Sequence, residues 1–104
     1  MNDIQKLRQE KNIVRLISEI FIKEFAPEYD VFVTFVDCKL SNDGSEARLG
    51  VSLYGDEEQG KKAWERLTRA SGYFAGRIAR KLRLRATPRF LFHRVEITDY
   101  SAAD

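Results

Sequence analysis

The spacing of apolar residues predicts six regular elements along this chain. Apolar residues recur at helical intervals over about 3–25 and again over 73–82. They form a nearly continuous β-branched and aromatic run over 29–40, and they alternate with polar residues over 46–54. A further helix is expected to begin after Asp56, and a last strand is expected from about 90 to 97. The order α-β-β-α-α-β predicts an α+β fold, a three-stranded sheet with helices on one face.

Polar residues and a proline set the ends of these elements. Asn2 or Asp3 can cap the first helix, and Pro27 ends it because the residue before proline is pushed out of the helical region. Residues 41–45, Ser-Asn-Asp-Gly-Ser, predict a tight turn, so the two strands around them should form an antiparallel hairpin. Asp56 can cap the second helix.

The two strands of this hairpin differ in their patterns. In the second strand an inward row is expected, consisting of Ala47, Leu49, Val51 and Leu53. The first strand is apolar on both faces: Val31, Val33 and Phe35 share one face, and Phe32, Val36 and Cys38 share the other. A central position in the sheet, or a second face that is partly covered, would explain this composition.

The composition is typical of one soluble globular domain. The chain has 104 residues, of which 43% are hydrophobic and 33% charged. No apolar run reaches the roughly 18 residues that cross a bilayer, and the first residues lack the features of a signal peptide. We therefore expect a single domain over 1–104, with a frayed tail over about 99–104, in a cytoplasmic protein without membrane contact.

Charge is distributed unevenly along the chain, although the net charge is only +2. Residues 1–60 carry 7 Lys and Arg against 12 Asp and Glu, whereas residues 61–104 carry 11 against 4. This asymmetry is typical of a surface that meets nucleic acid or an anionic membrane, and a solvated basic face is the alternative.

The densest cations surround the third predicted helix. Phe74, Ile78 and Leu82 fall four residues apart and form one apolar stripe, so the neighbouring cations should point away from the core. Few acidic residues lie near them in the sequence. The expected centre of the cationic surface consists of Arg77, Arg80, Lys81, Arg83 and Arg85. Arginine suits phosphate, so the pattern favours a helix pair that faces nucleic acid, with RNA as the expected ligand.

Gly72 interrupts the helical pattern just before this segment. Glycine inside a helix lowers its stability by about 1 kcal/mol relative to alanine, so a glycine at this position needs an explanation. One interpretation is a helix C-cap or a close packing contact. The other is a kink that lets a phosphate backbone approach the N-terminus of the following helix. Both can hold together.

The sequence offers no set of residues for catalysis. His93 is the only histidine and Cys38 the only cysteine, which excludes His-pair and Cys-based metal sites and an internal disulfide. His93 is expected to be a partly buried strand residue, Cys38 a small core residue and Trp64 a core anchor. No phosphate-binding loop of the GxxxxGK or GxGxxG type is present. We expect a protein that is not an enzyme and that binds no metal, cofactor or small-molecule substrate.

Three motifs resemble the ribosome-binding factor A family, bacterial maturation factors of the small ribosomal subunit. The first spans 41–51, with the pattern Ser-x-Asp-x-x-x-Ala-x-Leu-x-Val. The second is Ala-Ser-Gly at 70–72, which is similar to the Ala-x-Gly break of the family. The third spans 84–92, with the pattern Leu-Arg-x-x-Pro-x-Phe-x-Phe. The helical segment Leu-Ile-Ser-Glu-Ile at 16–20 also resembles the opening helix of the family, so the match covers nearly the whole chain in the family's order.

The resemblance implies a KH-like fold of type II, in which the Ala-x-Gly kink replaces the GxxG loop of ordinary KH domains. It also implies binding to the immature small (30S) subunit, assistance in maturation and processing of its 16S ribosomal RNA, and a role in cold adaptation. We expect a monomer. The candidate RNA-binding residues are Ala70, Ser71, Gly72, Arg77, Arg80, Lys81, Arg83, Arg85 and Arg89.

Two other functions remain open from the sequence. One is a KH-like module that binds other RNA or single-stranded DNA and is not tied to the ribosome. The other is a protein-interaction module whose basic face meets an acidic partner. A steep dependence of affinity on salt with RNA would favour the nucleic-acid functions.

Overall fold

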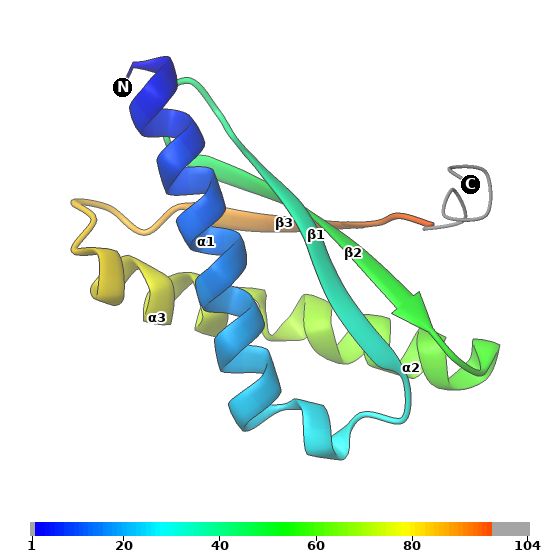
Figure 1. Cartoon of the computed structure of the whole chain (residues 1–104). Coiled ribbons are helices and arrows are strands. Elements are labelled where there is room, and N and C mark those ends of the chain that lie inside the picture. The colour runs from blue at the N-terminus through cyan, green and yellow to red at the C-terminus, as the bar shows by residue number, and fades with distance from the viewer. Residues whose placement is uncertain (1, 97–104) are drawn as a thin grey trace.

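The computed structural model describes residues 2–96, which fold as a three-stranded sheet and three α-helices (Figure 1). The elements are α1 (Asp3–Glu24), a 3-10 turn η1 (Ala26–Glu28), β1 (Phe32–Leu40), β2 (Glu46–Tyr54), α2 (Glu57–Arg69), α3 (Ser71–Leu82) and β3 (Arg89–Arg94). The predicted order α-β-β-α-α-β is confirmed. The predicted start of the first strand at residue 29 is three residues early, because residues 29–31 link η1 to β1 without strand pairing. The expected tail lies outside the described residues.

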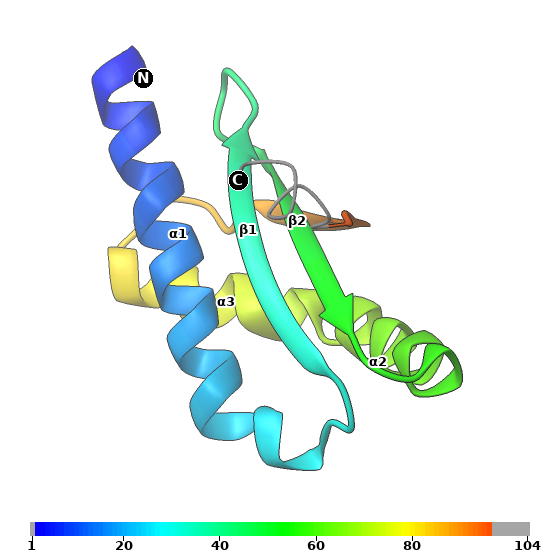
Figure 2. The same cartoon turned by 45° about the vertical axis from the view of Figure 1, so that its right-hand side comes forward.

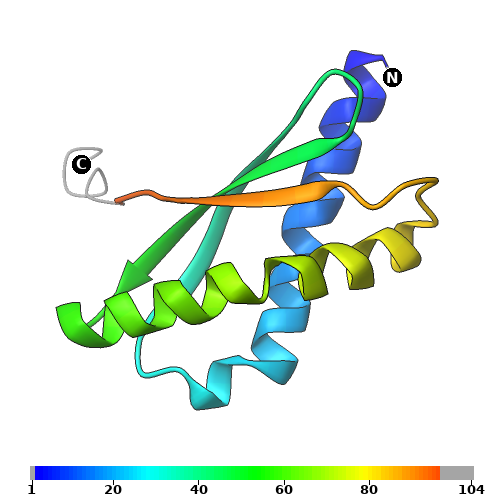
Figure 3. The ribbon, with the colours of Figure 1, turned by 180° about the vertical axis from the view of Figure 1, so that it is seen from behind.

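The strand order in the sheet is β1-β2-β3. β1 and β2 pair antiparallel through the turn at 41–45, as the sequence predicts, and β2 and β3 pair parallel. A parallel pair needs a crossover, which α2 and α3 supply. Figure 3 shows β3 running alongside these two helices. β2 is therefore the central strand, and β1 and β3 are the edges.

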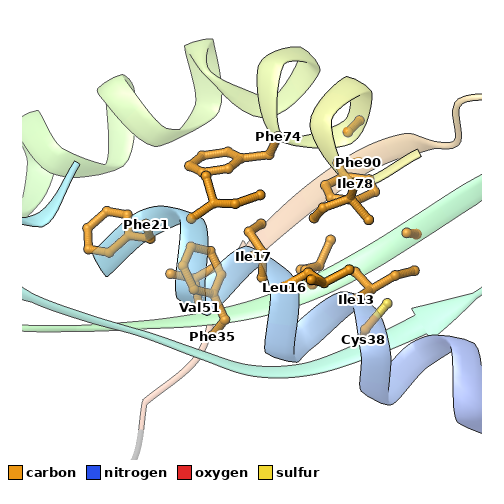
Figure 4. Close-up of a cluster of buried hydrophobic side chains, with 14 of the residues drawn as sticks. Ile13, Leu16, Ile17, Phe21, Phe35, Cys38, Val51, Phe74, Ile78 and Phe90 are labelled. Carbon is orange, nitrogen blue, oxygen red and sulfur yellow. The ribbon is translucent and has the colours of Figure 1, made fainter. Parts of the chain in front are cut away.

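The helices cover one face of the sheet, and the buried residues of β2 show which face it is. Ala47, Leu49 and Val51 are each 0% exposed, and Leu53 packs partly buried against the core, which confirms the predicted inward row. They meet apolar residues of α1 and α3 in one cluster. Figure 4 shows Ile13 and Ile17 of α1 pointing toward the same space as Phe74, Ile78 and the strand residues. Within residues 2–96, no helix packs against the opposite face of the sheet.

A β-bulge explains the two apolar faces of β1. The pairing with β2 shifts between Phe35 and Asp37, which inserts one extra residue and returns Cys38 to the same face as Phe35. Phe35 and Cys38 are both buried, whereas Phe32 and Val36 are 76% and 43% exposed. The expectation of a central strand or a covered second face is therefore wrong. β1 is an edge strand with one buried face.

The first turns of α1 extend beyond the sheet. Ile4 and Leu7 belong to the predicted apolar stripe but are 69% and 57% exposed, and burial begins only at Glu10. The Glu10 carboxylate is buried because it accepts a hydrogen bond from the Leu40 N–H at 2.7 Å. That amide lies on the outer edge of β1, so Glu10 satisfies a donor that the sheet leaves unpaired.

Side-chain hydrogen bonds cap the N-termini of α1 and α2 and stabilise the hairpin turn, as the sequence predicts. Asn2 accepts a hydrogen bond from the Gln5 N–H at 2.8 Å and Asp56 accepts one from the Gln59 N–H at 3.1 Å. In the turn, one carboxylate oxygen of Asp43 accepts from the N–H and the hydroxyl of Ser45 and from the hydroxyl of Ser41. These hydrogen bonds, the backbone one first, lower the pKa of Asp43 to about 2.

The low pKa of Asp43 predicts a loss of folding stability in acid. Because the folded-state pKa lies below the ordinary value of 3.8, the contribution of Asp43 is full above about pH 4 and is lost as pH falls toward about 2. The Asp43→Asn variant keeps an acceptor oxygen without this ionisation, so its unfolding free energy should fall less steeply over this range. Urea unfolding of both proteins at stepped pH measures the difference. Identical pH profiles would contradict the prediction.

None of the described helices is both long and apolar enough to cross a bilayer.

Candidate nucleic-acid interface

A groove runs between the junction of α2 with α3 and the strand β3. It encloses about 380 Å³. One wall comes from the last turn of α2 and the first turns of α3, and the other comes from consecutive residues of β3 and its approach. The lining residues are Thr68, Ser71, Gly72, Ala75, Thr87, Pro88, Arg89, Phe90, Leu91 and Phe92. Of the predicted site, Ser71, Gly72 and Arg89 thus meet in one place.

Ala70 makes the kink between the two helices. Its backbone angles, φ −89° and ψ 1°, end α2, and its N–H still bonds the carbonyl of Arg66 at 3.1 Å. Ala70 is also the N-cap of α3 and offers no side-chain acceptor to the first turn of that helix, which contains no acidic residue. The first turn of α3 therefore has neither a side-chain cap nor an acidic residue of its own, and it lies on the groove beside Ser71 and Gly72.

Gly72 has no role in the packing of the protein itself. It is exposed, lies inside the helical range of α3, and is not among the residues with positive φ. A Cβ atom built on it would meet no atom within 4 Å. Neither a C-cap nor a close packing contact explains this glycine, so that interpretation is wrong. The other interpretation, a phosphate backbone that approaches α3 from the groove side, stays a prediction.

Arg80 lies on the same side of α3 as Gly72. Gly72, Gly76 and Arg80 are spaced four apart, which places them in one row on a helix. The guanidinium of Arg80 folds back along this row, with Nη1 3.7 Å from the Cβ position of Gly76. Arg80 and Lys81 are both exposed in the last turn of α3. Arg80 therefore extends positive charge from the C-terminal end of α3 toward the kink.

Arg83 ends α3 in an unusual conformation. It has φ 54° and ψ 47°, and it is the only non-glycine residue with positive φ among residues 2–96. The next amide, of Leu84, bonds back to the carbonyl of Ala79 at 2.9 Å and closes the helix. Left-handed geometry costs a residue with a Cβ roughly 1–2 kcal/mol, and glycine is usual there. A backbone cost at an exposed cation is consistent with a role outside folding. Arg83 and Arg85 are both exposed.

Arg77 differs from the other predicted site residues because its charge is paired. Its Nη1 lies 2.6 Å from the Glu24 carboxylate of α1 and donates to the Tyr73 hydroxyl at 2.6 Å. Tyr73 in turn donates to Glu24 at 2.5 Å. These bonds, that of Tyr73 first, lower the pKa of Glu24. Few acidic residues lie near these cations in the sequence, but the fold brings Glu24 to Arg77. The expectation that Arg77 points toward water or an external anion is therefore wrong, and Arg77 joins α3 to α1.

The wall formed by β3 could not be found from the sequence. Pro88, Phe90 and Phe92 stand out as a motif, but only the topology shows that this edge strand lies against the kink. Thr68 is also missed, since its hydroxyl bonds the carbonyl of Trp64 at 2.8 Å, as an ordinary helical threonine does.

The single cysteine and histidine have no catalytic setting. Burial, together with the nearby charges of Glu10 and Asp37, raises the pKa of Cys38 to about 12, so its thiol stays protonated at neutral pH. Cys38 is a core residue, as predicted. Trp64 packs partly buried against the core, also as predicted. His93 is exposed on β3, so the expectation that it is partly buried is wrong.

Comparisons with known proteins agree on one family. The family model described as "Ribosome-binding factor A" matches residues 5–103. The chain is 33% identical over 86 residues to the ribosome-binding factor A of Halothermothrix orenii, which covers 83% of this chain and 70% of the relative. It is similar to the crystal structure of ribosome-binding factor A from Thermus thermophilus, with a TM-score of 0.70 and 28% identity, covering 86% of this chain and 94% of that one.

A second structure concerns a complex. It is a homology model of the Thermus thermophilus ribosome-binding factor A fitted into a cryo-EM map of that factor with the 30S. The TM-score is 0.66 at 28% identity, and the match covers 86% of this chain and 93% of that one. The fold class expected from the sequence is thus shared with these structures.

Proposed function

The chain belongs to the ribosome-binding factor A family, and on that premise we propose that it binds the small ribosomal subunit through RNA contacts at the α2–α3 groove. A homologous factor is described in complex with the 30S, which supports this partner. The proposed contact residues are those predicted from the sequence, except that Arg77 serves mainly to hold α3 against α1.

The observation that carries this proposal is the open environment of Gly72. Nothing within 4 Å would oppose a Cβ there, and the backbone is helical, so the protein keeps a helix-weakening residue without an internal reason. A nucleic-acid backbone that approaches the first turn of α3 would supply the reason. Phosphate is favoured at that position because the amide N–H groups and the helix dipole point toward it.

Cations around the groove would extend the contact along an RNA backbone. Arg89 lines the groove, Arg80 lies on the row of Gly72, and Arg83 and Arg85 follow at the end of α3. None of these four forms an ion pair within the described residues, so their charge is available to phosphates. The apolar wall with Phe90 and Phe92 is mostly turned to the core, which leaves recognition to backbone and charge rather than to base stacking.

Sedimentation with purified small subunits tests this function. We expect the protein to move with free small subunits at low salt and to dissociate as salt rises, with a linear fall of log affinity against log salt. Translating ribosomes serve as the comparison and should bind less. Absence from the small-subunit fractions at low salt would contradict the proposal. Equal binding to unrelated single-stranded RNA or DNA would instead support a module that is not tied to the ribosome.

The finer role that we infer is non-enzymatic assistance in maturation of small-subunit RNA, in the cytoplasm and as a monomer. A binding protein can act in this way by stabilising one folded state of the RNA over others. Cells that lack the gene should accumulate precursor small-subunit RNA, most strongly in the cold. Restoration by the wild-type gene, but not by a variant that fails to bind subunits, would link processing to the groove.

A further inference from the structure

The sheet face that points away from the helices carries an exposed aromatic pair. Phe32 of β1 and Tyr54 of β2 are direct cross-strand partners, and each is 76% exposed. In Figure 2, β1 and β2 lie in front of α2 and α3, so this face is turned away from the helices. Two neighbouring aromatic side chains with this much exposed surface are unusual, because aromatic side chains stabilise a fold mainly when they are buried.

The other end of the same face carries cations in an unfavourable arrangement. Lys39 of β1 lies directly opposite Arg48 of β2, and both are exposed. Like charges directly across a sheet destabilise it. On β3, Arg89 is the cross-strand neighbour of Glu46, yet neither these two nor Lys39 and Arg48 take part in an ion pair among residues 2–96. An external anion would relieve the repulsion.

Small side chains separate the two ends. Thr34 pairs with Ser52. Gly50, the next residue of β2 on this face, is buried next to the side chains of Asp37, His93 and Val95. Asp37 is the acidic group in this stretch, and its carboxylate accepts a hydrogen bond from the Gly50 N–H at 3.2 Å. The six residue steps from Arg48 to Tyr54 span about 20 Å of strand. The face thus carries cations at one end, aromatic rings at the other and one carboxylate between them.

We propose that this outer sheet face binds single-stranded RNA, with phosphates at Lys39 and Arg48 and bases on Phe32 and Tyr54. Single-stranded nucleic acid is recognised by this combination, because cations follow the backbone while aromatic rings stack on bases. A protein partner would use the rings but would leave the opposed cations unexplained. The site goes beyond the proposed function, since the α2–α3 groove lies on the helical side and on the edge of β3.

Crosslinking and affinity measurements with one probe test this site. The probe is a single-stranded oligouridylate of about 10 nucleotides carrying 5-iodouridine, which is within the usual site size for such proteins. Irradiation should crosslink it to Phe32 or Tyr54. The variant Phe32→Leu/Tyr54→Leu stays apolar but loses both rings, and should bind at least about tenfold more weakly. The variant Lys39→Gln/Arg48→Gln should be at least as stable as wild type. Its slope of log affinity against log salt concentration should be smaller by about 1.4.

The outcomes separate this site from the groove. In the Gly72→Ala variant, crosslinks to Phe32 and Tyr54 should persist at wild-type yield. Crosslinks confined to the α2–α3 groove, unchanged affinity of the leucine variant, or no binding of the probe at low salt would each overturn the inference. If Phe32→Leu/Tyr54→Leu abolished a concentration-dependent dimer instead, the face would be a protein interface. Sedimentation with small subunits tests binding through the α2–α3 groove independently of these results.

Discussion

Replacing Arg80 and Lys81 together by glutamate is expected to weaken binding to small ribosomal subunits by at least about 100-fold. Both residues are exposed at the end of α3, and Arg80 lies on the row that leads to Gly72. A charge-assisted hydrogen bond contributes about 1.5–3 kcal/mol, so the loss of two such contacts gives this factor, and repulsion adds to it. Affinity is measured by sedimentation with purified subunits at fixed salt.

The matched control is the variant Lys61→Glu/Lys62→Glu. It changes the net charge equally, and both lysines are exposed on α2, outside the groove lining. Folding of both variants should be unchanged, because exposed charges contribute little to stability. If the control lost as much affinity as Arg80→Glu/Lys81→Glu, binding would depend on overall charge and not on this end of α3. Wild-type affinity in the latter variant would place the site elsewhere.

Truncating Leu49 to alanine is expected to lower the free energy of unfolding by about 2–5 kcal/mol. Leu49 is 0% exposed on the central strand, where Cys38 and Phe92 are its neighbours on β1 and β3. The strands on both sides prevent the backbone from collapsing into the cavity. Because small domains are stable by only about 5–15 kcal/mol, this loss is a large part of the total. Urea unfolding measures it.

Ile22→Ala is the control for Leu49→Ala. It removes an aliphatic side chain of the same size, but Ile22 is 66% exposed on α1. We expect a change within about 0.5 kcal/mol for this exposed site. Equal effects of the two substitutions would mean that the core does not lie between β2 and the helices.

Periodicity predicts most of the fold because each element keeps its own pattern. The alternation in β2 identifies Leu49 and Val51 as buried, and the side-chain caps of α1 and α2 follow from residue type. The bulge in β1 could not be predicted, since Val36 is as apolar as its neighbours and only the pairing with β2 shows the extra residue. The pattern in α1 shows which side is apolar, but it cannot show how far the sheet extends beneath it.

The candidate site was predictable only where it depends on local residue type and spacing. Its cations and its glycine can be read from residue type and spacing. The pairing of Arg77 with Glu24 and the burial of Glu10 against Leu40 depend on contacts between residues far apart in the chain. The β3 wall of the groove likewise depends on the parallel pairing of β2 with β3. Local sequence carries no signal for these contacts.

The most direct test of the account compares Gly72→Ala with Gly76→Ala. Both substitutions add one methyl group to α3, and each Cβ has room. At Gly72 no described atom outside the local helix backbone lies within 4 Å of the Cβ position, and at Gly76 the nearest is Arg80 Nη1 at 3.7 Å. Helix propensity predicts that both variants become more stable, by up to about 1 kcal/mol. Only Gly72→Ala should bind small subunits more weakly. Full affinity in a stabilised Gly72→Ala protein would contradict the proposal that RNA approaches the backbone at this kink.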